Sequence, residues 1–120
     1  MARSVDPAEA HIPVSPVVLE ILLALGEGPM HGYAVAQAVR SRSTGRLRLE
    51  TGPLYRHLKR LLDDGLVEET SRRPDDDDPR RGAYYRLTAL GRGVVAMESR
   101  RLAELVARAR RARLTSESGA

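Results

Sequence analysis

One stretch constrains the fold more than any other: Thr51-Gly-Pro-Leu-Tyr-Arg-His-Leu-Lys-Arg-Leu-Leu-Asp-Asp-Gly65. The Thr51 hydroxyl can cap free backbone N–H groups, Pro53 stands where a missing donor does little harm, and Gly65 tolerates a left-handed helix end. The stretch therefore predicts a short helix. Its leucines recur at helical spacing and share one face, which we expect to be buried. They are Leu54, Leu58, Leu61 and Leu62.

The opposite face of this helix is cationic. It carries Arg56, Lys59 and Arg60, with Tyr55 beside them. A leucine-backed helix that presents Arg, Lys and Tyr outward has the charge and shape to enter a DNA major groove or to lie along phosphates. An ordinary amphipathic helix with a solvated basic face explains the same pattern. The elements around the helix have to distinguish the two interpretations.

Composition favours a nucleic-acid partner. The 120 residues predict one domain, near the size at which pairing with a second copy adds useful buried area. The formal net charge is +4, the sequence pI is near 10.1, and Lys59 is the only lysine. Arginine bonds phosphates and guanine edges in a bidentate manner, although codon usage in a GC-rich genome explains the choice of Arg over Lys equally well. The excess of positive charge is therefore better evidence for a nucleic-acid partner than the choice of Arg over Lys.

Several classes of protein are disfavoured. The chain has no cysteine, hence no disulfide, thiolate nucleophile or Cys-ligated zinc. The longest apolar run, from Val17 to Leu25, is interrupted by Glu20 and is shorter than the about 20 residues that span a bilayer. The N-terminal segment lacks the apolar core of a signal peptide. We therefore expect a cytoplasmic protein without a membrane partner.

The segments before the basic helix predict two further helices. Residues 1–15 show no periodicity and are expected to form a flexible N-terminal arm. Ser15 caps the next helix, which has Pro16 at its first position and a broad apolar face. This helix is expected to be largely buried and to end in the segment from Gly26 to Pro29.

A second helix is expected to start at Met30-His-Gly-Tyr33 and to end where residues 41–45 break its apolar spacing. Leu47 and Leu49 then alternate with charged residues, which fits a very short strand directly ahead of the basic helix.

The segments after the basic helix predict a β-hairpin. Residues 66–72 and 83–87 are typical of strands, and residues 73–82 between them of a solvated turn. The order of helices and strands predicts a mainly α fold with a small β-hairpin wing, a winged helix-turn-helix domain over residues 16–87. In such a domain the third helix reads DNA and the hairpin reaches the adjacent backbone.

The C-terminal part of the sequence predicts a long helix through which two copies of the chain can form a dimer. Thr88 caps a last helix, expected over residues 88–113, and residues 114–120 are expected to be a disordered tail. At about 1.5 Å per residue this helix extends beyond a three-helix body. Its apolar stripe needs a partner, and a second copy of the chain is the simplest one. The alternative is that the helix folds back on its own domain.

Four motifs stand in order along the chain. They are Gly28-Pro-Met-His-Gly-Tyr33, Thr51-Gly-Pro-Leu-Tyr-Arg-His-Leu-Lys-Arg-Leu61, Asp64-Gly-Leu-Val67 and Tyr84-Tyr-Arg-Leu-Thr-Ala-Leu-Gly91. Together they closely resemble the PadR family of bacterial transcriptional regulators. The resemblance implies a winged-helix DNA-binding domain with a single C-terminal dimerisation helix. It also implies a ligand-responsive repressor that binds a pseudo-palindromic operator as a homodimer.

The expected DNA-binding residues combine the positions of the family's recognition helix, the start of the second helix and two arginines that flank the wing turn. They are His31, Gly32, Tyr33, Thr51, Pro53, Tyr55, Arg56, Lys59, Arg60, Arg80 and Arg81. The helical spacing by itself selects the same basic residues of the third helix. Tyr55 either belongs to this surface or packs against the wing.

The wing turn departs from the family's pattern. It carries the acidic run Asp75 to Asp78, which phosphates would repel. The flanking arginines can contact the DNA backbone from the stems of the hairpin while the acidic tip points away. Alternatively, the run pairs with them in the free protein and lowers non-specific affinity. These arginines are Arg72, Arg73, Arg80 and Arg81.

The resemblance also implies a small-molecule effector pocket at the dimer interface, between the first and last helices. The apolar candidates for the interface and its pocket are Leu19, Leu22, Leu23, Leu90, Val94, Met97, Leu102 and Leu105. Ordinary packing explains each of them singly.

Site chemistry of other kinds finds no support in the sequence. His11, His31 and His57 are too scattered for metal-ligand spacing, and no catalytic constellation is present. We therefore expect no metal, no cofactor and no enzymatic activity. The rival interpretation is a winged-helix module that binds other proteins without binding DNA, because a fold does not determine its function.

Overall fold

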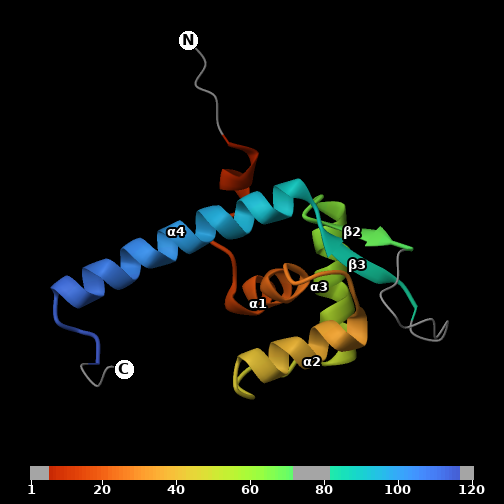
Figure 1. The fold of residues 1–120 in the computed structure, drawn as a ribbon, viewed down its shortest axis with the longest axis horizontal. Helices are drawn as coiled ribbons and strands as arrows, with labels where there is room; N and C mark the ends of the chain where they lie inside the picture. Colours follow the sequence, from red (N-terminus) through yellow and green to blue (C-terminus); the bar gives the residue numbers. More distant parts are fainter. Residues whose placement is uncertain (1–5, 72–81, 117–120) are drawn as a thin grey trace, which may run out of the picture.

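The computed structural model describes residues 6–71 and 82–116. Within these ranges a 3-10 helix, four α-helices and three short strands follow in the order η1, α1, β1, α2, α3, β2, β3, α4. Figure 1 shows α1, α2 and α3 gathered into one body, with β2 and β3 at its side and α4 running over it and away from it. This arrangement confirms the predicted fold, a winged helix-turn-helix with a long C-terminal helix.

The first two helices begin much as the sequence indicates. Helix α1 (Pro16–Leu25) starts where the Ser15 hydroxyl accepts the N–H of Val18 at 3.3 Å, and it buries the side chains of Ile21, Leu22, Ala24 and Leu25. Helix α2 (Gly32–Arg42) begins two residues later than expected, because Met30 and His31 form strand β1.

Helix α3 (Thr51–Asp63) lies within the stretch predicted to be helical, but it lacks the predicted cap. Its N-cap is Glu50, which makes no side-chain capping bond, so Thr51 is the first helical residue and does not cap the helix. The apolar face is confirmed, since Leu54, Leu58 and Leu61 are buried. The left-handed end is confirmed as well, because Gly65 has a φ of +78°.

The sheet holds one strand in an unexpected place. Strands β1 (Met30–His31), β3 (Tyr84–Leu87) and β2 (Val67–Thr70) pair antiparallel in that order. The expected strand at residues 47–49 is absent, so that prediction was wrong. The alternation of Leu47 and Leu49 reflects partial burial against the core. It does not reflect sheet pairing, because residues 47–49 belong to none of the three strands of the described sheet.

Helix α4 (Ala89–Arg111) starts against the end of α3. The Thr88 hydroxyl accepts the N–H of Gly91 at 3.0 Å, which confirms the predicted cap, and donates to the carbonyl of Gly65 at 2.6 Å. The backbones approach so closely here that a Cβ atom on Gly91 would overlap the carbonyl oxygen of Leu66. Glycine is therefore required at this position of the helix.

The described part of the N-terminal arm is ordered, which corrects the expectation of a flexible segment for residues 6–15. Asp6 caps the 3-10 helix η1 (Pro7–His11), and Ala8 is buried in the core. The N–H of Val14 donates to Oε2 of Glu98 at 2.7 Å, so the arm is held on α4. The sequence shows no periodicity here because the contacts that order the segment are distant along the chain.

Candidate nucleic-acid interface

The outer face of α3 carries the cations that the helical spacing selected. Arg56, Lys59 and Arg60 are exposed, whereas the leucines of the helix pack into the core. The guanidinium of Arg56 reaches back over the first turn, where Nη1 lies 3.6 Å from the position that a Cβ on Gly52 would take. The face is therefore cationic and accessible, and its contact with DNA stays a prediction.

Two of the three cations are already paired along the helix. Lys59 Nζ lies 3.3 Å from Asp63 Oδ2, and Arg60 Nε lies 3.9 Å from Asp64 Oδ2. The side chains of Lys59 and Asp63 are 76% and 65% exposed, so water and salt reach this pair freely. Within the described ranges Arg56 has no acidic partner.

The start of α2 is held by a buried histidine. His31 Nδ1 accepts the N–H of Ala34 at 3.2 Å, and the ring meets Tyr84 edge-on with centroids 5.4 Å apart. Such a buried ring orients the helix start and is poorly placed to reach a phosphate. Tyr33 is the exposed residue of the motif, at 62%, and its hydroxyl accepts a bond from Gln37 Nε2 at 2.8 Å.

Tyr55 lies at the junction of α3, the start of α2 and the sheet. A Cβ on Gly32 would stand 2.5 Å from the Tyr55 hydroxyl oxygen. Residue 32 therefore has to be small for the Tyr55 ring to fit. Burial raises the pKa of Tyr85 on β3, and the nearby Tyr55 and Glu69 raise it further. Tyr55 thus packs near the sheet and still leaves 44% of its surface exposed.

A second group of cations lies on the outer side of α2 and on the loop that follows it. Arg40, Arg46 and Arg48 are exposed and, in the described part of the chain, have no acidic partner. Arg40 and Arg48 line one groove of about 290 Å³. Its other lining residues are Tyr33, Ala36, Gln37, Leu49, Glu50 and Thr51.

Sequence reasoning missed these arginines as candidates, although a signal was present. Arg46 and Arg48 alternate with half-buried Leu47 and Leu49, and the alternation turns both cations toward solvent. The neighbouring Arg42 differs, because it forms an ion pair with Glu27 in which Nη2 lies 2.8 Å from Oε1. The hydrogen bond from Arg42 lowers the pKa of the Glu27 carboxyl.

The wing residues of interest fall outside the described ranges. They are the expected DNA-contacting Arg80 and Arg81, the flanking Arg72 and Arg73, and the acidic run from Asp75 to Asp78. Their assignment stays a prediction.

The expected dimer and effector residues divide by burial. Leu22 and Val94 are fully buried inside the single chain, where they form part of the core. Leu19, Leu90, Met97 and Leu102 are half-buried, whereas Leu23 and Leu105 are exposed. The half-buried and exposed residues are thus the ones that can meet a second chain, and a shared interface stays a prediction.

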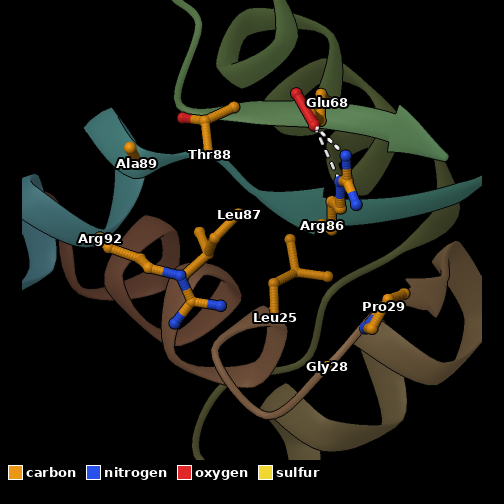
Figure 2. A pocket seen from close by; sticks show the side chains of 9 residues that line it. All are labelled: Leu25, Gly28, Pro29, Glu68, Arg86, Leu87, Thr88, Ala89 and Arg92. Atoms are coloured by element: carbon orange, nitrogen blue, oxygen red, sulfur yellow. Dashed lines mark hydrogen bonds and ion pairs between the residues drawn. The ribbon is translucent and has the colours of Figure 1, made fainter.

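The largest pocket described lies elsewhere, between the end of α1, strand β3 and the start of α4. Figure 2 shows Arg92 extending past Leu87 in the direction of Leu25. It also shows Glu68 paired with Arg86 across the strands, where Arg86 Nη2 and Glu68 Oε2 are 2.7 Å apart. Its volume is about 600 Å³, and none of the expected effector residues lines it. The pocket therefore gives no support to the expected effector site.

Glu98 is a buried carboxylate on α4 that sequence reasoning also missed. Its Oε1 accepts from Arg101 Nε at 2.6 Å and its Oε2 from Arg101 Nη2 at 2.9 Å, besides the bond from Val14. Hydrogen bonding by Arg101 holds the pKa of Glu98 below its ordinary value, against the opposing effect of burial. The signal was its place four residues after Val94, on the buried face of the helix.

The described ranges contain neither a candidate metal site nor a candidate membrane-spanning helix. No group of three or more His, Asp or Glu side chains there could hold a metal ion. None of the helices described is long and apolar enough to cross a bilayer.

Comparison with known proteins identifies the family and the fold. The sequence profile described as the Transcriptional regulator PadR-like family matches residues 21–97, from the middle of α1 into α4. No protein with a curated description matches the chain.

Solved structures share the fold. RosR of H. salinarum is 28% identical, with a TM-score of 0.62 over 81% of this chain and 82% of that one. A transcriptional regulator from Clostridium thermocellum is 21% identical, with a TM-score of 0.65 over 95% of this chain and 100% of that one. A PadR family transcription regulator from Clostridium difficile R20291 is 19% identical, with a TM-score of 0.65 over 81% and 97%.

Proposed function

Because this chain belongs to the PadR-like family of transcriptional regulators, we propose that it binds double-stranded DNA as a homodimer and represses transcription from a pseudo-palindromic operator. The observation that supports DNA binding most directly is the exposed cationic face of α3, mounted on buried Leu54, Leu58 and Leu61. Arg40 and Arg48 extend the same charge across α2 and the following loop. A recognition helix with cations on its flank suits a groove bordered by phosphates.

The proposed dimer pairs the C-terminal halves of two α4 helices. Figure 1 shows this half of α4 extending beyond the body formed by α1, α2 and α3. It carries Leu105 and Val106, which are 37% and 46% exposed, next to half-buried Leu102. Two α3 helices would then enter successive major grooves, with half-sites about 34–36 Å apart. A small-molecule effector would act by changing this spacing from the dimer interface.

Salt dependence tests the contact with DNA. Fluorescence anisotropy with the DNA upstream of the chain's own gene should show affinity falling steeply with salt, because bound phosphates release counterions. Arg56→Ala and Lys59→Ala should each weaken binding, uniformly across sequences for a phosphate contact and selectively for a base contact. Arg100→Ala, an exposed arginine on α4, is the control that removes the same charge elsewhere. Binding that is absent or insensitive to salt would favour a protein-interaction module instead.

Sedimentation velocity tests the assembly. The wild-type chain should sediment as a dimer, and Leu105→Glu should shift it toward the monomer because a carboxylate would be buried in the interface. Glu104→Ala, a change at the exposed neighbouring position, should leave the dimer intact. A monomeric wild-type chain would contradict the proposed mode of binding.

A further inference from the structure

The recognition helix places a carboxylate four residues after each of two cations. Lys59 faces Asp63 and Arg60 faces Asp64, at 3.3 and 3.9 Å. By contrast, four residues after Arg56 stands Arg60, another cation, and no acidic side chain of the described ranges lies against Arg56. The outer face of α3 is therefore neutralised toward its C-terminal end and left cationic toward its N-terminal end.

Helix stability alone does not account for these carboxylates. Asp63 is the last residue of α3 and Asp64 is its C-cap, beside the free carbonyl groups of the helix end. That end carries partial negative charge, so acidic side chains are disfavoured there. Exposed ion pairs at this spacing contribute little to folding and weaken with salt. The placement is more informative as a feature of the binding surface.

DNA phosphates compete for the same cations. While Lys59 and Arg60 are paired with carboxylates, contact with a phosphate has to exchange one anion for another, and the gain from counterion release is reduced. A duplex that contacts Lys59 or Arg60 therefore has to displace Asp63 or Asp64, whereas contact with Arg56 displaces no acidic side chain of the described ranges.

We propose that Asp63 and Asp64 limit the DNA affinity of α3, because they keep Lys59 and Arg60 in internal ion pairs that a bound phosphate has to replace. The inference rests on the proposed DNA binding and concerns how tightly that surface holds a duplex. Removal of either carboxylate should therefore raise the affinity for a random duplex.

The experiment measures the affinity of Asp63→Asn and Asp64→Asn for a random-sequence duplex over a salt series. Each change should raise that affinity about two- to five-fold and steepen the slope of log K against log salt by about 0.9, as one further phosphate is neutralised. Glu104→Gln on α4 removes the same charge at an exposed position and should change neither quantity. Urea denaturation of each variant confirms that it is folded.

A double-mutant cycle separates ion pairing from simple repulsion between carboxylate and DNA. If Asp63 acts through Lys59, Asp63→Asn has no effect on the duplex affinity in a Lys59→Ala background. An equal gain in both backgrounds, or no gain in either, would overturn the inference. If the wild-type chain binds neither the operator nor random duplex at low salt, the proposed function itself fails, and this outcome is distinct from the first two.

Discussion

Two ion pairs formed within single helices of this protein have almost the same chemistry and opposite surroundings. On α3, Lys59 and Asp63 stand in solvent, and no other side chain of residues 6–71 and 82–116 forms an ion pair with either of them. On α4, Glu98 is buried, receives two bonds from Arg101 and one from the backbone of Val14. The first pair can exchange partners with ions or phosphates, whereas the second holds the N-terminal arm on the last helix. Burial determines which role a charge pair has.

The same contrast separates two regions of the molecule. The start of α4 is fixed by close backbone contact, a cap and a buried carboxylate, and changes there should cost stability. The outer face of α3 is solvated, and changes there should alter binding with little effect on folding. Single substitutions in the two regions test this contrast.

Gly91→Ala should cause the largest loss of stability. The added Cβ would overlap the Leu66 carbonyl oxygen, and because both are backbone-anchored, α4 has to shift. We expect the free energy of unfolding to fall by about 3 kcal/mol, at the upper end of overpacking effects. The measurement is urea denaturation followed by circular dichroism.

Gly93→Ala is the matched control for that change. Its Cβ would meet only the Cβ of Ala8, at an ordinary 3.7 Å. Alanine favours the helix over glycine, so this variant should be more stable than wild type by about 0.5–1 kcal/mol. Equal losses of unfolding free energy in the two variants would show that the close backbone approach at Gly91 does not cause the destabilisation.

Glu98→Gln should have the next largest effect. Glutamine keeps an acceptor for Val14 but loses the charge that binds Arg101, so we expect about 2 kcal/mol less stability, the scale of a hydrogen bond to a charged group. Glu104→Gln at an exposed position of the same helix should change the free energy of unfolding little. Similar values for the two variants would contradict the structural role of Glu98.

The pH dependence of stability provides a further test of Glu98. Its pKa is lowered in the folded state, mainly by Arg101, from an ordinary value of 4.5. The unfolded chain therefore takes up this proton first, so the stabilisation is present above pH 4.5 and is lost as the pH falls toward the folded pKa. Between neutral pH and about pH 3.5, Glu98→Gln should lose less stability than wild type. Parallel curves for the two proteins would exclude the coupling.

Asp63→Asn should have the smallest effect on folding. An exposed pair at i,i+4 contributes at most about 0.5 kcal/mol, so the unfolding curve should nearly coincide with that of wild type. The same variant is expected to raise the affinity for random duplex. A change in DNA affinity without a change in stability would distinguish the outer face of α3 from the start of α4. A loss of stability as large as that of Glu98→Gln would remove the distinction between the two pairs.

Local patterns were sufficient to predict most of the fold. The leucine spacing of α3, the left-handed Gly65 and the Thr88 cap each depend on a few neighbouring residues, so they can be recognised in one sequence. The outward direction of Arg56 follows from the same spacing. Its role at a DNA surface depends on an interaction that neither the pattern nor the fold tests.

The features that were missed depend on contacts between distant residues. Strand β1 is two residues long and exists because β3, more than 50 residues later, lies beside it. Glu98 is buried because the arm folds over α4 and Arg101 neutralises it. Arg40 and Arg48 belong to one groove only after the loop has turned. Local spacing turns Arg48 outward and places Glu98 on the buried face, but the partners of these residues cannot be read from it.

The double role of Thr88 has a mechanical consequence. One hydroxyl both caps α4 and bonds the carbonyl of Gly65, directly after α3, while the Thr88 N–H bonds the carbonyl of Leu66 at 3.1 Å. These bonds join the start of α4 to the residues that directly follow α3. In the proposed dimer, a rotation of α4 would therefore move α3 with it.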